Sequence, residues 1–196
     1  MLQIRIHGRG GQGVVTAAEM LSVAAFEQGR FAQAFPSFGS ERTGAPVVAF
    51  CRIDDKDIRL REPILEPDVL IVQDATLLHQ VDVFQGLKPD GYVLINSKRS
   101  FGELGLAEIE RRFRHERLIT VPATEIALRH LGRPLPNAVL LGGFAALSGL
   151  ITLDAVSHAI GDKFAGKVAQ ANVAAAAEAF DFVKRQMEAL AHAQAD

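Results

Sequence analysis

The chain has 196 residues, 48% of them hydrophobic and 22% charged, which is typical of one globular α/β domain with a proper core. The formal net charge is −2, and lysine and arginine form no long basic run, so we expect no nucleic-acid partner and no binding to an anionic membrane surface. The single cysteine excludes an internal disulfide and an iron–sulfur cluster held by this chain alone.

The first 30 residues predict a strand, a glycine turn and a helix. Residues 2–7 are typical of a buried strand ending at Gly8, and they lack the pattern of a signal peptide. Over residues 13–28 apolar side chains recur at helical spacing, and Gly29 closes that helix. The longest apolar stretch, residues 138–151, is too short for a membrane span. We therefore expect a cytoplasmic protein without membrane insertion.

The segment 31–46, FAQAFPSFGSERTGAP, shows neither a helical nor a strand period. We expect a long ordered loop, and loops of this length in compact domains are usually functional. Residues 47–53 and 56–60 flank Asp54-Asp55, and this arrangement predicts an inserted β-hairpin.

Strands and helices alternate after this point. Three nearly continuous apolar runs predict strands that are covered on both faces, as in a parallel sheet: DVLIVQD (68–74), GYVLINS (91–97) and RLITVPA (117–123). We expect helices over three intervening segments: from residue 74 to about Phe84, at 103–113 and at 124–131.

The pattern after Pro136 is helical, over residues 137–147, 153–160 and 168–191. The predicted fold class is α/β: a single Rossmann-like domain over residues 1–190, with a mostly parallel sheet, helices on both faces, the inserted hairpin and a helical C-terminus. Residues 191–196 are expected to form a frayed tail.

The glycine turn is the strongest candidate site. Gly8, Gly10 and Gly13 match G-x-G-x-x-G, and Gly11 adds a fourth glycine. Such a turn lets backbone N–H groups approach a phosphate at the positive end of a helix, and Arg9 adds positive charge. The acidic residue that holds the ribose in a dinucleotide site is missing about 20 residues further on. A different phosphate or a carboxylate, a dinucleotide and a purely structural turn stay open as interpretations.

Other candidate residues have structural interpretations. The histidines show no metal-ligand spacing, so we expect no metal site. The sequence also lacks the G-x-S-x-G motif that would indicate a hydrolase. Cys51 is expected to be an inert core thiol, and His7 a structural histidine. Asn137 is interpreted as a helix cap, and Gly142-Gly143 as a place of close packing.

Five stretches together resemble one protein family, the gamma subunit of the 2-oxoacid:ferredoxin oxidoreductases, of which pyruvate:ferredoxin oxidoreductase is the familiar member. They are GRGGQGVVT (8–16), AQAFPSFGSERTGAPV (32–47), IRLR (58–61), EPDVLIVQD (66–74) and NAVLLGGF (137–144). The glycine turn combined with F-P-x-F-G-x-E-R-x-G-A-P is far more specific than either motif alone. The similarity extends over most of the chain, from about Ile4 to Asn172.

The resemblance implies a subunit of a complex that decarboxylates a 2-oxoacid with coenzyme A (CoA), gives acyl-CoA and carbon dioxide, and passes two electrons to ferredoxin or another acceptor. It also implies partner subunits of alpha, beta and ferredoxin-like delta type, which hold thiamine diphosphate with Mg²⁺ and [4Fe-4S] clusters. This chain shows no thiamine motif, so we expect no catalytic residue in it and no activity alone.

The resemblance further implies two sites in this chain. The turn residues Gly8, Arg9, Gly10, Gly11, Gln12 and Gly13 are the candidates for binding CoA or a phosphate. The candidates for a subunit interface or a substrate-access loop are Phe35, Pro36, Phe38, Ser40, Glu41 and Arg42. The alternatives are a nucleotide-binding regulatory or redox module and a purely structural brace. Pyruvate, 2-oxoglutarate, branched-chain, indolepyruvate-type and aryl 2-oxoacids such as phenylglyoxylate all stay open as substrates.

Overall fold

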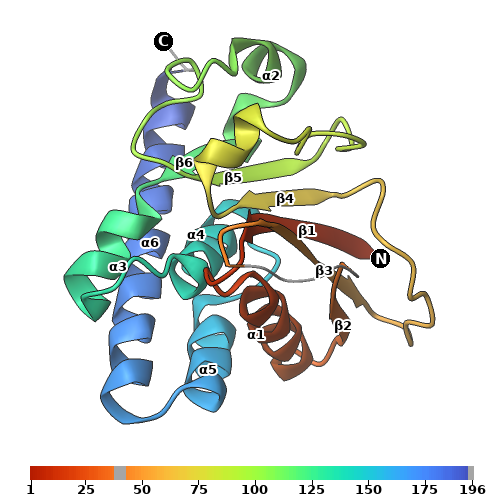
Figure 1. Ribbon diagram of the computed structural model, residues 1–196, viewed down its shortest axis with the longest axis vertical. Helices are drawn as coiled ribbons and strands as arrows, with labels where there is room; N and C mark the ends of the chain where they lie inside the picture. Colours follow the sequence, from red (N-terminus) through yellow and green to blue (C-terminus); the bar gives the residue numbers. More distant parts are fainter. Residues whose placement is uncertain (38–42, 194–196) are drawn as a thin grey trace.

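A computed structural model describes residues 1–37 and 43–193 of the chain. In these residues six strands form one sheet in the order β2-β3-β1-β4-β5-β6 (Figure 1). The strands are β1 (Leu2–Arg9), β2 (Phe31–Pro36), β3 (Pro46–Asp54), β4 (Val69–Val72), β5 (Tyr92–Asn96) and β6 (Leu118–Val121).

The helices lie mostly in the C-terminal half of the chain. They are α1 (Val14–Glu27), α2 (Ala107–Arg112), α3 (Ala123–Leu131), α4 (Asn137–Ser148), α5 (Leu153–Lys163) and α6 (Gly166–Ala193), with short 3₁₀ helices at Ala75–His79 and His115–Arg117. Helix α6 therefore includes residues 191–193 of the expected tail, and residues 194–196 lie outside the described part.

The sheet has a parallel half and an antiparallel half. Strands β1, β4, β5 and β6 are parallel neighbours, whereas β3 pairs antiparallel with both β1 and β2. All four residues of β4 are buried, as expected for a parallel strand with both faces covered. The predicted α/β class with a mostly parallel sheet is confirmed.

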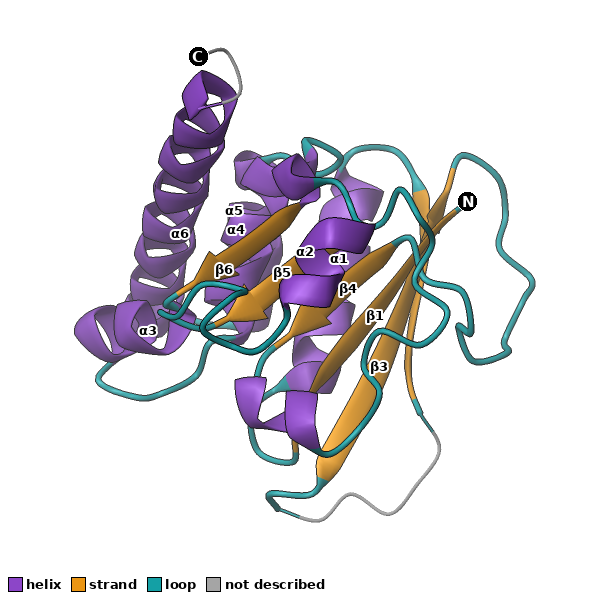
Figure 2. Ribbon diagram, turned by 90° about the horizontal axis from the view of Figure 1, so that it is seen from above, coloured by secondary structure: helices purple, strands orange, loops and turns teal. Residues whose placement is uncertain are grey.

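Two hydrophobic clusters cover the two faces unequally. The larger cluster joins one face of the sheet to α1, α3, α4, α5 and α6, and α4 packs against both β5 and α6. The smaller one covers the other face of β4, β5 and β6 with short helices and turns. Figure 1 shows α1, α4 and α5 on one side of the sheet and α2 on the other, and Figure 2 shows α6 beside the β6 edge.

Residues 31–36 form strand β2, so the prediction of a loop throughout 31–46 is wrong for this part. The two alanines in FAQAFP have a low preference for strands, which conceals the alternation in the sequence. Ala32 and Ala34 pack on the larger cluster, and backbone pairing with β3 stabilises the strand.

The hairpin predicted around Asp54-Asp55 is also wrong, because residues 56–60 form no strand. The antiparallel partner that precedes β3 in the chain is β2. Strand β3 already pairs with β1 and β2, so neither of its edges is free for residues 56–60. The chain instead crosses the sheet face, where the buried Arg52 side chain donates a hydrogen bond to the Glu62 carbonyl oxygen at 2.6 Å.

Two helices are shorter than predicted. The segment 74–84 contains only the 3₁₀ helix Ala75–His79, and the segment 103–113 contains only α2, Ala107–Arg112. Gly105 has a φ of 76°, which no α-helix accommodates, so α2 can begin only after it.

Candidate functional site

The glycine turn is hydrogen-bonded to the segment that leads into β3. The N–H group of Gly10 donates to the Ala45 carbonyl oxygen at 2.9 Å, and the N–H group of Gly44 donates to the Gly10 carbonyl oxygen at 3.0 Å. Gly10 and Thr43 form a parallel β-bridge. The two motifs that carry the family resemblance therefore meet in space, although they lie some 35 residues apart in the sequence.

The Arg9 side chain connects this turn to the start of the 3₁₀ helix Ala75–His79. Its guanidinium donates hydrogen bonds to Thr76 Oγ1 at 2.7 Å and to the Gly44 carbonyl oxygen at 3.0 Å. It also donates to Gln80 Oε1 at 3.0 Å and lies 3.3 Å from an Asp74 carboxylate oxygen. Arg9 thus positions the turn, and its charge is shared with Asp74.

The Gln12 side chain forms two hydrogen bonds that stabilise the turn. Its side-chain oxygen accepts the Arg9 N–H group at 2.8 Å, and its side-chain nitrogen donates to Asp74 Oδ2 at 2.8 Å. Burial opposes ionisation of Asp74, but hydrogen bonds from Thr76 and Gln12 and the charge of Arg9 outweigh it, so the pKa of this carboxyl is lowered. Asp74 is therefore an anionic anchor, not a proton donor, at neutral pH.

Gly13 caps helix α1 in a left-handed conformation with a φ of 68°. A Cβ atom there would lie 2.5 Å from Asn137 Nδ2, so both the backbone conformation and the close approach require glycine. Asn137 donates to the Gly13 carbonyl oxygen at 3.4 Å, so it supports the start of α1 and does not cap its own helix through its side chain.

The N-terminus of α1 can accept an anion. The first-turn N–H groups of a helix have no partner inside it, and here no side chain caps them and no acidic residue lies in the first turn. Gly11 and Gly13 line two depressions, of about 660 Å³ and 230 Å³. The larger one lies between α1, the loop before α4, and the start of α6, and it is lined by Thr16, Arg133, Leu135, Asn137, Lys167 and Asn172 among others.

The larger cavity combines positive charge with apolar walls. Arg133 and Lys167 line it, and neither forms an ion pair within residues 1–37 and 43–193. Leu131, Leu135 and Val168 contribute apolar surface. Such a lining suits a molecule that carries an anionic group on a less polar body.

The remaining turn residues support this arrangement or lie at its surface. Gly8 is buried inside β1, and Gly11, with a φ of 93°, is exposed at the tip of the turn. Of the six candidates for an interface loop, Phe35 and Pro36 belong to β2, whereas Phe38, Ser40, Glu41 and Arg42 lie outside the described residues. Phe35 packs against Phe50, with ring centres 5.1 Å apart.

His7 is buried in β1, with only 7% of its surface exposed. Its Nε2 atom has no hydrogen-bond partner among the described residues. Burial, together with the nearby charge of Arg5, lowers the pKa of His7 to about 3. The imidazole is therefore neutral in the folded protein throughout the physiological pH range. Cys51 is buried as expected, and burial raises the pKa of its thiol to about 12.

His7 should make the protein sensitive to acid. The unfolded chain binds a proton at His7 below pH 6.5, and the folded chain binds one only near pH 3, so stability falls as the pH is lowered between these values. From pH 7.5 to 5.0 this group should cost about 2 kcal/mol of unfolding free energy. We expect urea titrations at both pH values to show that loss, and His7→Leu to reduce it by the same amount. An equal loss in the variant would contradict the prediction.

Comparison with known proteins places the chain in a family. The fold is that of an α/β protein with a glycine turn between β1 and the N-terminus of α1. Residues 3–182 match the family described as pyruvate ferredoxin/flavodoxin oxidoreductase, and the chain belongs to this family. The resemblance inferred from the five sequence stretches is thereby confirmed. None of the helices in the described residues is long and apolar enough to span a membrane.

Relatives of similar length share about half of the sequence. The common gamma subunit of the pyruvate/ketoisovalerate oxidoreductases of Pyrococcus abyssi is 50% identical over 181 residues, which cover 92% of this chain and 96% of the relative. The pyruvate synthase subunit PorC of Methanocaldococcus jannaschii is also 50% identical over 181 residues, which cover 92% of this chain and 96% of that relative. The crystal structure of the pyruvate oxidoreductase subunit PORC of Thermotoga maritima covers 92% of this chain and 95% of its own, with 36% identity and a TM-score of 0.77.

Several site residues carry no signal that sequence reasoning could use. Arg133 and Lys167 are isolated cations in segments with no motif, and only the fold brings them to one cavity. Thr76 and Gln80 accept hydrogen bonds from Arg9, and both belong to a segment expected to be an ordinary helix. Asp74 is the last residue of EPDVLIVQD, one of the stretches that carry the family resemblance. This stretch is the sequence signal that pointed to the segment around Asp74.

Proposed function

We propose that this chain is the gamma subunit of a complex that converts a 2-oxoacid and CoA into acyl-CoA and carbon dioxide. The reaction releases two electrons and a proton, and the electrons pass to ferredoxin or another acceptor. Thiamine diphosphate with Mg²⁺ and the [4Fe-4S] clusters belong to alpha, beta and ferredoxin-like delta subunits. The family membership and the relatives of matching length support this assignment. The buried Cys51 leaves this chain without an accessible thiol.

The role proposed for this chain is to bind CoA beside the glycine turn. The observation that carries it is the open cavity between α1 and α6, which combines the uncapped α1 N-terminus with the side chains of Arg133 and Lys167. A phosphate of CoA would accept hydrogen bonds from the first-turn N–H groups of α1. The two cations would neutralise further phosphate charge, and the apolar walls would pack against the rest of the molecule.

The choice of 2-oxoacid belongs to the partner subunits in this proposal. The relative from Pyrococcus abyssi is named for both pyruvate and ketoisovalerate as a common subunit, so one gamma chain of that organism serves two oxidoreductases. A gamma chain shared in this way contributes to steps that both reactions have in common. Binding of CoA is such a step.

The segment between β2 and β3 is proposed to face the partner subunits. Its described ends are fixed: the Ser37 N–H group donates to the Val48 carbonyl oxygen at 2.8 Å, and Thr43 pairs with Gly10 at the turn. Phe35, Pro36, Phe38, Ser40, Glu41 and Arg42 are the residues assigned to this interface or to the access route of the substrate. Aromatic and arginine side chains are the residue types that anchor such contacts.

The test uses the assembled complex with the double substitution Arg133→Ala/Lys167→Ala. Loss of two charge-assisted contacts should raise the KM for CoA about 10- to 100-fold, with little change in the KM for the 2-oxoacid. Lys56→Ala, which removes an exposed lysine at the turn after β3, is the matched control. Unchanged CoA kinetics in the double variant would favour the alternative of a structural brace.

A separate measurement tests the division of roles. The isolated chain should not reduce a viologen dye when given a 2-oxoacid and CoA, because the electron-transferring groups are assigned to partners. Calorimetry with NAD(H) and FAD tests the remaining alternative, a nucleotide-binding module. The topology does not favour that alternative: β3 lies between β1 and β2 and pairs antiparallel with both, so β1, α1 and β2 do not form the unit of two adjacent parallel strands that a dinucleotide site uses.

A further inference from the structure

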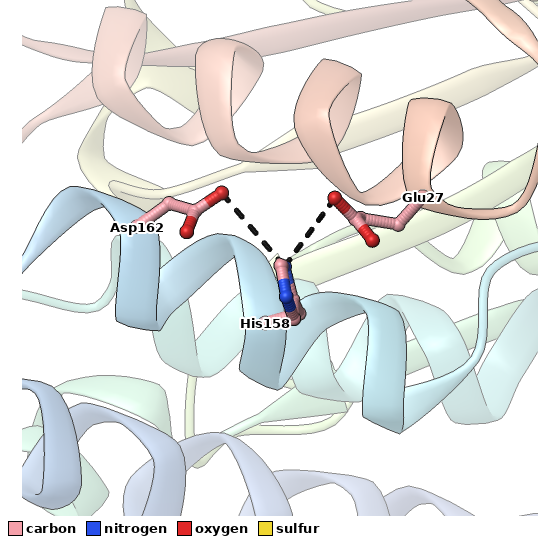
Figure 3. Close-up of side chains that lie close together, drawn as sticks. All are labelled: Glu27, His158 and Asp162. Atoms are coloured by element: carbon pink, nitrogen blue, oxygen red, sulfur yellow. Dashed lines mark ion pairs between the residues drawn. The ribbon is translucent and has the colours of Figure 1, made fainter.

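Three polar side chains meet on the surface formed by α1 and α5, away from the glycine turn. Glu27 ends α1, and His158 and Asp162 lie one turn apart on α5. Figure 3 shows both carboxylates pointing toward the His158 ring, from opposite sides of it. Glu27 Oε1 lies 3.4 Å and Asp162 Oδ2 lies 3.8 Å from His158 Nδ1. Each of the three residues offers one ligand atom within 4.8 Å of those of the other two.

These distances fit metal ligands better than hydrogen bonds. Neither carboxylate is hydrogen-bonded to the imidazole, and the separations exceed the usual 2.7–3.2 Å of an N–H···O bond. One Nδ1 proton can satisfy only one of the two carboxylates in any case. Two ligand atoms bound tetrahedrally to one metal ion at about 2.0–2.1 Å are about 3.3 Å apart, so small side-chain rotations would bring all three atoms to a shared ion.

The backbone around these side chains is already held in place. On one side of the cluster, the Thr152 N–H group donates to Gln28 Oε1 at 2.9 Å, which ties the start of α5 to the end of α1. On the other side, Lys163 Nζ pairs with Glu19 Oε2 at 2.8 Å. Helices α1 and α5 also pack against each other, and both contribute buried residues to the larger cluster, so a bound ion would mainly order side chains. This reduces the entropy lost on binding.

We propose that Glu27, His158 and Asp162 bind a first-row divalent transition-metal ion, for which Zn²⁺ is the probe. One imidazole nitrogen and two carboxylate oxygens are borderline-hard ligands that Zn²⁺ accepts, and the remaining coordination position is left to water or to a partner group. A dication also neutralises the two carboxylates together. The site is separate from the proposed CoA site, and a bound ion would cross-link α1 and α5.

The experiment uses the full chain, stripped of metal with a chelator and then titrated with Zn²⁺ by calorimetry at pH 7.5. We expect one Zn²⁺ per chain and a higher melting temperature at saturation. His158→Ala should weaken binding at least about tenfold, because one of three ligands is lost. Glu27→Gln and Asp162→Asn keep the shape of exposed side chains, so they test the carboxylates with the fold intact.

A matched control separates this cluster from the other surface histidines. His192, exposed on the last turn of α6, is replaced by alanine and should leave Zn²⁺ binding unchanged. Absence of binding up to millimolar Zn²⁺, or equal affinity in the wild type and His158→Ala, would overturn the proposal. Equal weakening by His192→Ala would also overturn it, because binding would then be unspecific. None of these outcomes bears on the CoA proposal.

Discussion

Replacing Gly142 with alanine is expected to destabilise the protein by about 3 kcal/mol, the cost of overpacking a site that cannot relax. A Cβ atom at this position would lie 2.0 Å from the Ala176 carbonyl oxygen and 2.6 Å from its carbonyl carbon. These are backbone atoms of α6, so no side-chain rotation relieves the contact, and α4 and α6 must move apart. The movement would open the large cluster that covers the sheet.

The neighbouring glycine supplies the control for this prediction. The three atoms nearest to a Cβ atom at Gly143 would be side-chain carbons of Leu94, Val121 and Val183, each at 3.5 Å, which is ordinary van der Waals contact. Alanine is about 1 kcal/mol more favourable than glycine inside a helix, so Gly143→Ala should be neutral or slightly stabilising. Urea denaturation of both variants measures the difference. Similar stabilities for the two variants would contradict the close packing at Gly142.

Replacing Arg9 with alanine is expected to lower kcat/KM for CoA in the assembled complex about 10- to 100-fold. The substitution removes hydrogen bonds to Thr76, Gln80 and the Gly44 carbonyl oxygen. It also leaves the partly buried Asp74 carboxylate without its positive neighbour. Losses of this kind cost about 1–3 kcal/mol each, and they act on the segment that positions the turn. Arg9→Lys should restore little, because an ammonium cannot replace the planar fork.

The control for Arg9 is Arg30→Ala, at the opposite end of the antiparallel strands. Arg30 pairs with the exposed Asp55 at 3.2 Å, a surface interaction worth little. Its removal should leave the kinetics for CoA unchanged. For Arg9→Ala we expect kcat/KM for CoA to fall while the KM for the 2-oxoacid stays unchanged. If Arg9→Ala and Arg30→Ala gave the same CoA kinetics, the turn would serve as a brace and not as a binding site.

The sequence predicted the parts of the fold that depend on local signals. Continuous apolar runs identified β4, β5 and β6, because a strand buried on both faces needs apolar side chains at almost every position. Helical spacing located α1 and the helices after Pro136 for the same local reason. The combined motifs identified the family, and the comparison confirmed it.

Strand β2 and the hairpin were missed because pairing partners are not local. The sequence FAQAFP has little intrinsic preference for a strand, and it becomes one by pairing with β3. Ile58 and Leu60 alternate with Arg59 as in a strand, but this segment finds no free edge, because β1 and β2 occupy both sides of β3. Local preference is worth too little free energy to override the register of the whole sheet.

The sequence alone determined the family, the parallel core and the glycine turn, since these depend on motifs and on the side-chain period of each segment. Only the tertiary structure decided that Arg9 is held by Asp74, that Arg133 and Lys167 share a cavity, and that Glu27 approaches His158. Each of these arrangements joins residues from different helices or strands. Their distances are set by how the helices pack on the sheet, and no local pattern encodes that packing.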